Sequence, residues 1–255
     1  MRRASYRTPY GGPLSPILSN NVLDELDWEL ERRGLRFARY ADDRNIFVCS
    51  RRAGERVMGS ICKFLETRMR LKVNAEKSAV RTPGEGHFLG FCFRCARGRD
   101  DAVVVSLSRK AAKRLGETIR TMTPGNWGRS LQACMDELSR HLNGWMAHYR
   151  LCTPEGAEEF KRFDAHIRRR LRAIIVRQKK RPRFLYRHLL RRGASRKAAS
   201  SAAYCGRGAW NRSNRPGMTR AYPPSWFKGR LASLTRRWKE LNTPKQASSQ
   251  LSLAL

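Results

Sequence analysis

Two adjacent carboxylates have residue types and a spacing that could do chemistry. They are Asp42 and Asp43 of the string Tyr40-Ala41-Asp42-Asp43, and they lie between two runs with strand composition, 37–41 and 45–49. The acids are therefore expected at the tip of a β-hairpin. Neighbouring carboxylates repel each other unless a cation lies between them. Two Mg²⁺ ions about 4 Å apart would relieve that repulsion and clamp the attacking and leaving oxygens of a phosphoryl transfer. Aspartate is also a common turn residue, so the pair alone equally fits an ordinary turn.

The elements that must position this pair are predicted on both sides of it. Ser15-Pro16 has the pattern of a helix start, with serine as the N-cap and proline in the first turn, and Gly34 is expected to end the helix. The apolar stripe predicted for that helix is Leu18, Val22, Leu26 and Leu30. A second helix is expected over 54–69. Strands are expected at 71–73, 87–93 and 103–105, the last two paired across a turn at 97–100.

The period of the apolar residues changes to that of helices after about residue 106. Stripes over 107–119 and 131–149, and a third over 160–174 capped by Thr153-Pro154, predict three helices that pack as a bundle. The segments 195–201 and 243–255 have the composition of a linker and a tail. We therefore predict an α+β chain with units at 1–105, 106–192 and 193–255, the last basic and partly ordered.

The charge of the chain points to a polyanionic partner. Its 255 residues carry 54 Lys and Arg against 21 Asp and Glu, a net charge of +33. Residues 165–239 contain 23 Lys and Arg and no acid, interleaved with aromatic rings. Nucleic acid is the first expectation and an anionic membrane surface the second, whereas an acidic small molecule would not require so much charge.

Two further features bear on the compartment. No run of 18 apolar residues is present, so no membrane span is expected. The seven cysteines are odd in number and scattered, which favours reduced thiols and a cytoplasmic location.

Five blocks of sequence, in order, resemble bacterial group II intron reverse transcriptase/maturases. The first is Arg7 to Asn20 with Leu23 to Asp27, similar to the palm motif that precedes Tyr-Ala-Asp-Asp in that family. Asn74 to Ser78 and Phe88 to Phe91 resemble the next two palm blocks. Leu142 to Arg150 resembles the thumb, or maturase, region, which Arg168 to Arg172 and Lys179 to Pro182 continue. The resemblance implies a partial palm, with antiparallel hairpins packed against two helices, followed by an all-α thumb/maturase bundle.

The resemblance also implies roles for individual residues. Asp42 would be a metal ligand, Asp43 a second and less tightly engaged carboxylate, and Mg²⁺ the cofactor, with two ions in a complete site. Lys77 would lie near the triphosphate and protonate the pyrophosphate leaving group; a surface lysine after a strand remains the alternative. The residues implied at the template–primer or nucleotide are Tyr10, Gly11, Gly12, Pro13, Ser15, Tyr40 and Gly90. For Gly90, an ordinary β-bulge glycine remains an alternative. The residues implied to bind nucleic acid are Arg168, Arg169, Arg170, Arg172, Lys179, Lys180 and Arg181.

The chain departs from the family pattern in two ways. Tyr10 stands where the family has glutamine, so a ring with one hydroxyl replaces an amide that both donates and accepts. The upstream palm aspartate that would bridge both ions is absent. Asp24 and Asp27 belong to the helix after the glycine block, where solvation is expected, and do not replace it. We therefore expect no polymerisation by this chain alone; a second polypeptide would have to supply the fingers and that aspartate.

Two functions follow from these observations. The first is an RNA-directed DNA polymerase and maturase of a group II intron, in truncated form, acting on intron RNA and on an RNA template with a DNA primer. The second is a non-catalytic maturase fragment or splicing chaperone that binds intron RNA through its basic helical region.

Overall fold

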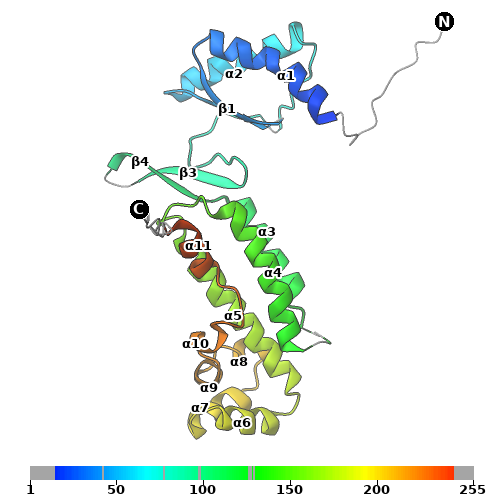
Figure 1. Cartoon of the computed structure of the whole chain (residues 1–255), viewed down its shortest axis with the longest axis vertical. Helices are drawn as coiled ribbons and strands as arrows, with labels where there is room; N and C mark the ends of the chain where they lie inside the picture. The colour runs from blue at the N-terminus through cyan, green and yellow to red at the C-terminus, as the bar shows by residue number, and fades with distance from the viewer. Residues whose placement is uncertain are drawn as a thin grey trace, which may run out of the picture. The chain divides into compact units, whose positions relative to one another are not determined.

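The computed structural model describes residues 15–41, 43–76, 78–96, 99–125, 128 and 130–243. The chain divides into two compact units, Met1–Cys92 and Phe93–Leu255. Figure 1 shows the elements of both units, which are described separately below. The predicted α+β class is confirmed, because two small antiparallel sheets accompany a majority of helices. The predicted domain boundaries stay predictions.

The first unit is built from two helices and one hairpin. Helix α1 (Ser15–Arg32) is followed by strands β1 (Arg36–Tyr40) and β2 (Asp43–Phe47) and by helix α2 (Arg51–Thr67). Gly34, with φ +66°, ends α1 as predicted and donates its N–H to the Glu31 carbonyl oxygen. The side chain of Ser50 caps α2 by accepting from the Ala53 N–H.

The core of this unit forms where both helices meet one face of the hairpin. Leu26 and Leu30 of α1 and Ile61 of α2 are buried, and Phe37 and Ile46, cross-strand partners, pack against them. The predicted stripe on α1 is therefore wrong in its first half: Leu18 and Val22 remain 50% and 47% exposed. From α1, the hydrophobic cluster includes only residues of the second half of the helix.

Two sequence predictions for the segment after α2 need correction. Residues 71–73 do not form a strand, and the strand predicted at 87–93 begins only at Phe91. Strand β3 (Phe91–Ala96) pairs with β4 (Arg99–Leu107), the predicted partner.

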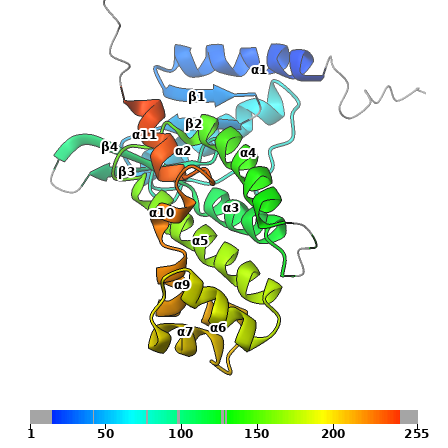
Figure 2. The same cartoon turned by 60° about the horizontal axis from the view of Figure 1, so that its bottom comes forward.

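The second unit is helical beyond β4. Helices α3 (Arg109–Met122), α4 (Leu131–Tyr149) and α5 (Glu158–Gln178) form the predicted bundle, with α3 packed on α4 and α4 on α5. Ser108 and Ser130 cap α3 and α4 with their side chains. Helix α11 (Leu234–Asn242) packs against both α4 and α5, and Figure 2 shows it alongside this bundle.

Helix α5 starts later than predicted. Thr153 caps the turn before α5 and not the helix itself: its hydroxyl accepts from the Gly156 N–H at 3.5 Å. The same hydroxyl donates to the Val105 carbonyl oxygen at 3.4 Å, and the Thr153 backbone N–H donates to that oxygen at 3.0 Å. A turn follows, and the helix begins at Glu158, with Glu158 and Glu159 in the first turn, where negative charge complements the helix dipole.

The remaining helices are short and occupy a region predicted in part as a linker. They are α6 (Pro182–Arg191), α7 (Arg196–Ala203), α8 (Ala209–Arg212), α9 (Pro216–Ala221) and α10 (Pro224–Phe227). The linker predicted at 195–201 is wrong, since Ser195 caps α7 and Ala198, Ala199 and Ala202 are buried. Helices α6, α7 and α9 pack on one another. The predicted tail at 243–255 lies outside the described residues except for Thr243.

Candidate functional site

The hairpin turn places one of the two predicted acids at the start of a strand. Tyr40 and Asp43 are cross-strand partners, so the loop of the hairpin is Ala41 and residue 42 alone. Ala41 has φ +53°, as the first position of a type I′ hairpin turn requires. Asp42 itself lies outside the described residues. The predicted hairpin is confirmed, whereas the geometry of the acid pair stays a prediction.

The face of the hairpin that meets α1 carries a partly buried ionic network. Arg39 and Arg44, cross-strand partners, both bond to Asp27 of α1, with N–O distances of 2.5 Å to each. Burial lowers the pKa of Arg44, and the adjacent Asp27 carboxylate opposes that shift. The expectation that Asp27 is solvated is therefore wrong, while Asp24 is exposed and accepts from the Trp28 ring N–H.

The opposite face of the hairpin is open to solvent. Tyr40 is 63% exposed, and the Asp43 side chain is exposed and has no ion-pair partner among the described residues. Because side chains alternate along a strand, Asp43 lies on the face away from Asp27. A free carboxylate oxygen is the ligand that Mg²⁺ prefers, so Asp43 fits a role in holding the ion. No group of three His, Cys, Asp or Glu side chains forms a metal cluster in the part of the chain that the structure describes.

Several predicted site residues cannot be placed. Tyr10, Gly11, Gly12, Pro13 and Lys77 lie outside the described residues. Ser15 is the first residue of α1. Their roles stay predictions.

Gly90 is part of a tight turn. Phe88 and Phe91 exchange backbone hydrogen bonds at 3.0 and 2.9 Å, and the two residues between them both have positive φ, Leu89 at +52° and Gly90 at +85°. These angles are those of a type I′ turn. The conformation of Gly90 is therefore set by this turn, and the role implied for it at the primer stays a prediction.

Three of the arginines predicted to bind nucleic acid make contacts within the second unit. Arg170 donates to the hydroxyl and carbonyl oxygens of Thr123 at 2.5 and 2.7 Å, which satisfies the carboxyl end of α3. Arg169 stacks on Trp210, with 3.9 Å from its guanidinium carbon to the ring centroid. Arg172 is buried, and burial lowers its pKa. Arg169 and Arg170 therefore hold α5 to its neighbours, whereas Arg172 is packed within the unit.

Arg168 is half-buried within α5, and the three remaining predicted cations lie where α5 ends. Lys180 and Arg181 are exposed and Lys179 is half-buried, in the short connection to α6. Two acids flank the acid-free run, and both are already engaged. Asp164 is buried and accepts from the Ser233 hydroxyl and the N–H groups of Leu234 and Thr235. Glu240 pairs with Arg236 and Arg237.

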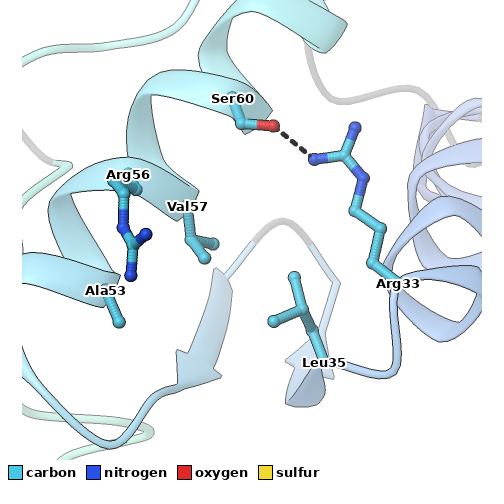
Figure 3. Close-up of a pocket in the computed structure, with 6 residues that line it drawn as sticks. All are labelled: Arg33, Leu35, Ala53, Arg56, Val57 and Ser60. Atoms are coloured by element: carbon cyan, nitrogen blue, oxygen red, sulfur yellow. Dashed lines mark hydrogen bonds between the residues drawn. The ribbon is translucent and has the colours of Figure 1, made fainter.

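A cavity of about 330 Å³ lies between α2 and the start of β1 in the first unit. Figure 3 shows Leu35, Val57 and Arg56 around it, and Arg33 at its edge donating to the Ser60 hydroxyl at 2.5 Å. Leu35 precedes β1, whose far end is Tyr40, so the cavity lies at the end of the hairpin opposite the turn. It is therefore not part of the predicted metal site.

The network at Asp27 was not predicted from the sequence, although the two strands carry a pattern that indicates it. Arg39 and Arg44 alternate with Phe37 and Ile46 on one strand face. Arginines that share a strand face with core residues are poorly solvated, so an acid is expected near them.

Fold and charge together define a class: an α+β chain with a small hairpin unit and a strongly basic helical unit. Two family models match it. The model described as reverse transcriptase (RNA-dependent DNA polymerase) matches residues 2–93, and the model of the group II intron maturase-specific domain matches residues 112–193. With both, in this order on one chain, the protein belongs to the group II intron reverse transcriptase/maturase family. No curated protein matches the chain. Among the described residues, no helix is both long and apolar enough to cross a membrane.

Proposed function

We propose that this chain is a maturase that binds structured intron RNA through its basic helical unit. The observation that carries the proposal is the run from 165 to 239, with 23 Lys and Arg and no acid. Asp164 is taken up by the Ser233 hydroxyl and backbone N–H groups, and Glu240 pairs with Arg236 and Arg237 alone, so the other cations of the run form no ion pair among the described residues. Such a surface binds a polyanion and releases the counterions condensed on it. The match to the maturase-specific domain over 112–193, which covers much of this unit, supports intron RNA as that polyanion.

Binding of the full chain to a fluorescent group II intron RNA tests this proposal. We expect binding with a steep loss of affinity between 50 and 200 mM salt, by about 10³-fold or more if six or more phosphates are contacted. The variant carrying both Asp42→Asn and Asp43→Asn should bind at least as tightly as the wild type, because removing acids that repel phosphate cannot weaken binding. An affinity that does not change with salt would contradict the proposal.

A second candidate function is nucleotidyl transfer, favoured by the free carboxylate on the open face of the hairpin. The reverse transcriptase model covers this hairpin, and that family depends on divalent metal in general. We propose that Asp42 and Asp43 hold Mg²⁺, which when bound would neutralise charge that develops on the phosphoryl oxygens. Lys77 would donate a proton to the leaving pyrophosphate. The ionic network at Asp27 fixes both strands and so fixes the direction of Asp43.

Binding of Mn²⁺, a paramagnetic substitute for Mg²⁺, separates this candidate from RNA binding alone. In an electron paramagnetic resonance titration, Asp43→Asn should weaken Mn²⁺ binding at least tenfold. The exposed Asp24→Asn serves as the control of equal charge change and should leave the titration unchanged. Equal titrations for wild type and Asp43→Asn would leave the chain as an RNA-binding maturase only.

A further inference from the structure

A cavity of about 550 Å³ lies where α5 passes into α6 in the second unit. Residues from the end of α5, the connection and one face of α6 line it: Gln178, Lys179, Lys180, Arg181, Phe184, Arg187, His188 and Arg191. The positions on α6 follow the helical spacing of one face. Figures 1 and 2 both show α6 following α5 with only a short connection between them.

Five of the eight lining residues are cations and none is an acid. None of these five cations forms an ion pair among the described residues: Lys179, Lys180, Arg181, Arg187 and Arg191. The ion pairs found elsewhere in the chain are mostly between neighbours on one helix. Positive charges gathered around one cavity repel one another, and an anion inside it would relieve that repulsion.

One wall of the cavity is neutral. The Nε2 atom of His188 is 2.5 Å from the Tyr222 hydroxyl, and the two rings stack. Burial lowers the pKa of His188, and the charges of Lys179, Arg192 and Arg191 lower it further. The cations therefore surround an uncharged aromatic wall, which a base or a sugar can contact.

Phe184 adds a partly exposed aromatic ring to this wall. Its side chain is 46% exposed, while the adjacent Leu185 is buried and fixes the helix in the core. The Arg183 guanidinium lies 5.1 Å from the Phe184 ring centroid. An exposed ring beside cations is the arrangement that stacks an unpaired base while its backbone is neutralised.

We propose that this cavity binds a bent, unpaired stretch of RNA, with successive phosphates at the five cations and one base stacked on Phe184. The inference rests on the proposed function, because it names the part of the RNA that the basic unit recognises. A continuous duplex does not satisfy the site, since its bases are paired and cannot reach the Phe184 ring.

The experiment compares two RNAs of equal length with the full chain: a hairpin with an unpaired loop and a blunt duplex. Phe184→Leu should weaken binding of the loop RNA about tenfold and leave duplex binding within about twofold, because only the stacked base is lost. Lys180→Gln with Arg181→Gln should lower the slope of log affinity against log salt by about 1.4 for the loop RNA. Arg109→Gln with Lys110→Gln, two exposed cations at the start of α3, is the matched control and should weaken both RNAs alike.

Three results would overturn the inference. In the first, Phe184→Leu changes both RNAs equally or neither. In the second, Lys180→Gln with Arg181→Gln weakens both RNAs alike, as Arg109→Gln with Lys110→Gln does. In the third, inorganic pyrophosphate displaces the loop RNA at a matched phosphate concentration, which would assign a site for free phosphates instead. Each leaves RNA binding by the chain intact, whereas a wild-type chain that binds neither RNA would overturn the proposed function itself. Circular dichroism of each variant checks that the helices remain folded.

Discussion

Asp27 is the residue on which the hairpin depends. Its carboxylate joins α1 to both strands through Arg39 and Arg44, and none of the three side chains is more than 21% exposed. Each arginine comes from a different strand, so the pair of bonds also fixes the register. An arginine left without this carboxylate would be a poorly solvated charge.

We expect Asp27→Asn to lower the free energy of unfolding by about 2–3 kcal/mol, somewhat less than a fully buried pair would lose. Urea unfolding of the full chain measures this. The exposed Asp24→Asn, three residues earlier on the same helix, should change the stability by less than about 0.5 kcal/mol. Equal losses for the two variants would mean that the network contributes no more than surface charge.

At the scale of elements, Gly217 allows α9 to approach α7 closely. A Cβ atom at this position would meet the backbone carbonyl of Ala198, which cannot move like a side chain. The alanines of α7 are buried at the same contact. Small residues on both helices are thus what brings the two backbones together.

Gly217→Ala should destabilise the protein by about 1–3 kcal/mol, because the two helices must separate. Gly144→Ala is the control: Gly144 lies within α4, and a Cβ there meets nothing within 4 Å. The control should stabilise by about 0.5–1 kcal/mol through helix propensity. Thermal unfolding followed by circular dichroism compares both, and a neutral Gly217→Ala would refute the close approach.

Elements with their own local signals could be predicted from the sequence, and those defined by distant contacts could not. The turn glycine at position 34 and the two-residue hairpin loop are encoded within a few residues. By contrast, residues 195–201 have the composition of a linker, and contacts with the distant α9 and with α6 are what bury Ala198 and Ala199 of α7. Thr153 caps a turn, as its local sequence suggests, but its bonds to the distant Val105 carbonyl oxygen and the later start of α5 are not encoded nearby. At the α6 cavity, the sequence predicted the cations of the connection, Lys179 to Arg181, but not Arg187 and Arg191, which the fold of α6 brings to the same cavity.

At the scale of the whole molecule, an excess of positive charge makes folding sensitive to acid. Burial lowers the pKa of both His166 and His188, and nearby arginines and Lys179 lower it further. The unfolded chain therefore binds protons on these rings at a higher pH than the folded chain does. Their contribution to stability is fully present above about pH 6.5 and is lost as the pH falls through their lowered folded values.

We expect the urea midpoint of the full chain to fall between pH 7 and pH 5. The variant with His166→Gln and His188→Gln should show a flatter dependence over this window, although its stability at pH 7 is lower. His148→Gln removes an exposed histidine from α4 and serves as the control. Parallel curves for the wild type and the double variant would assign the acid sensitivity to the carboxylates.

Helix α11 gives the molecule an order of events during its synthesis. It packs on α4 and α5, its first turn is bonded to Asp164, and Trp238 and Asn242 donate to the Arg150 carbonyl oxygen at 3.1 and 3.0 Å. All of these partners emerge from the ribosome some 70 to 90 residues before α11 does. Because synthesis proceeds at about 5–20 residues per second, the surface of α4 and α5 that α11 covers stays exposed for several seconds of translation. A nascent chain that has not yet reached residue 234 therefore exposes the faces of α4 and α5 that α11 later covers, and a chain ending before that residue would leave them exposed permanently.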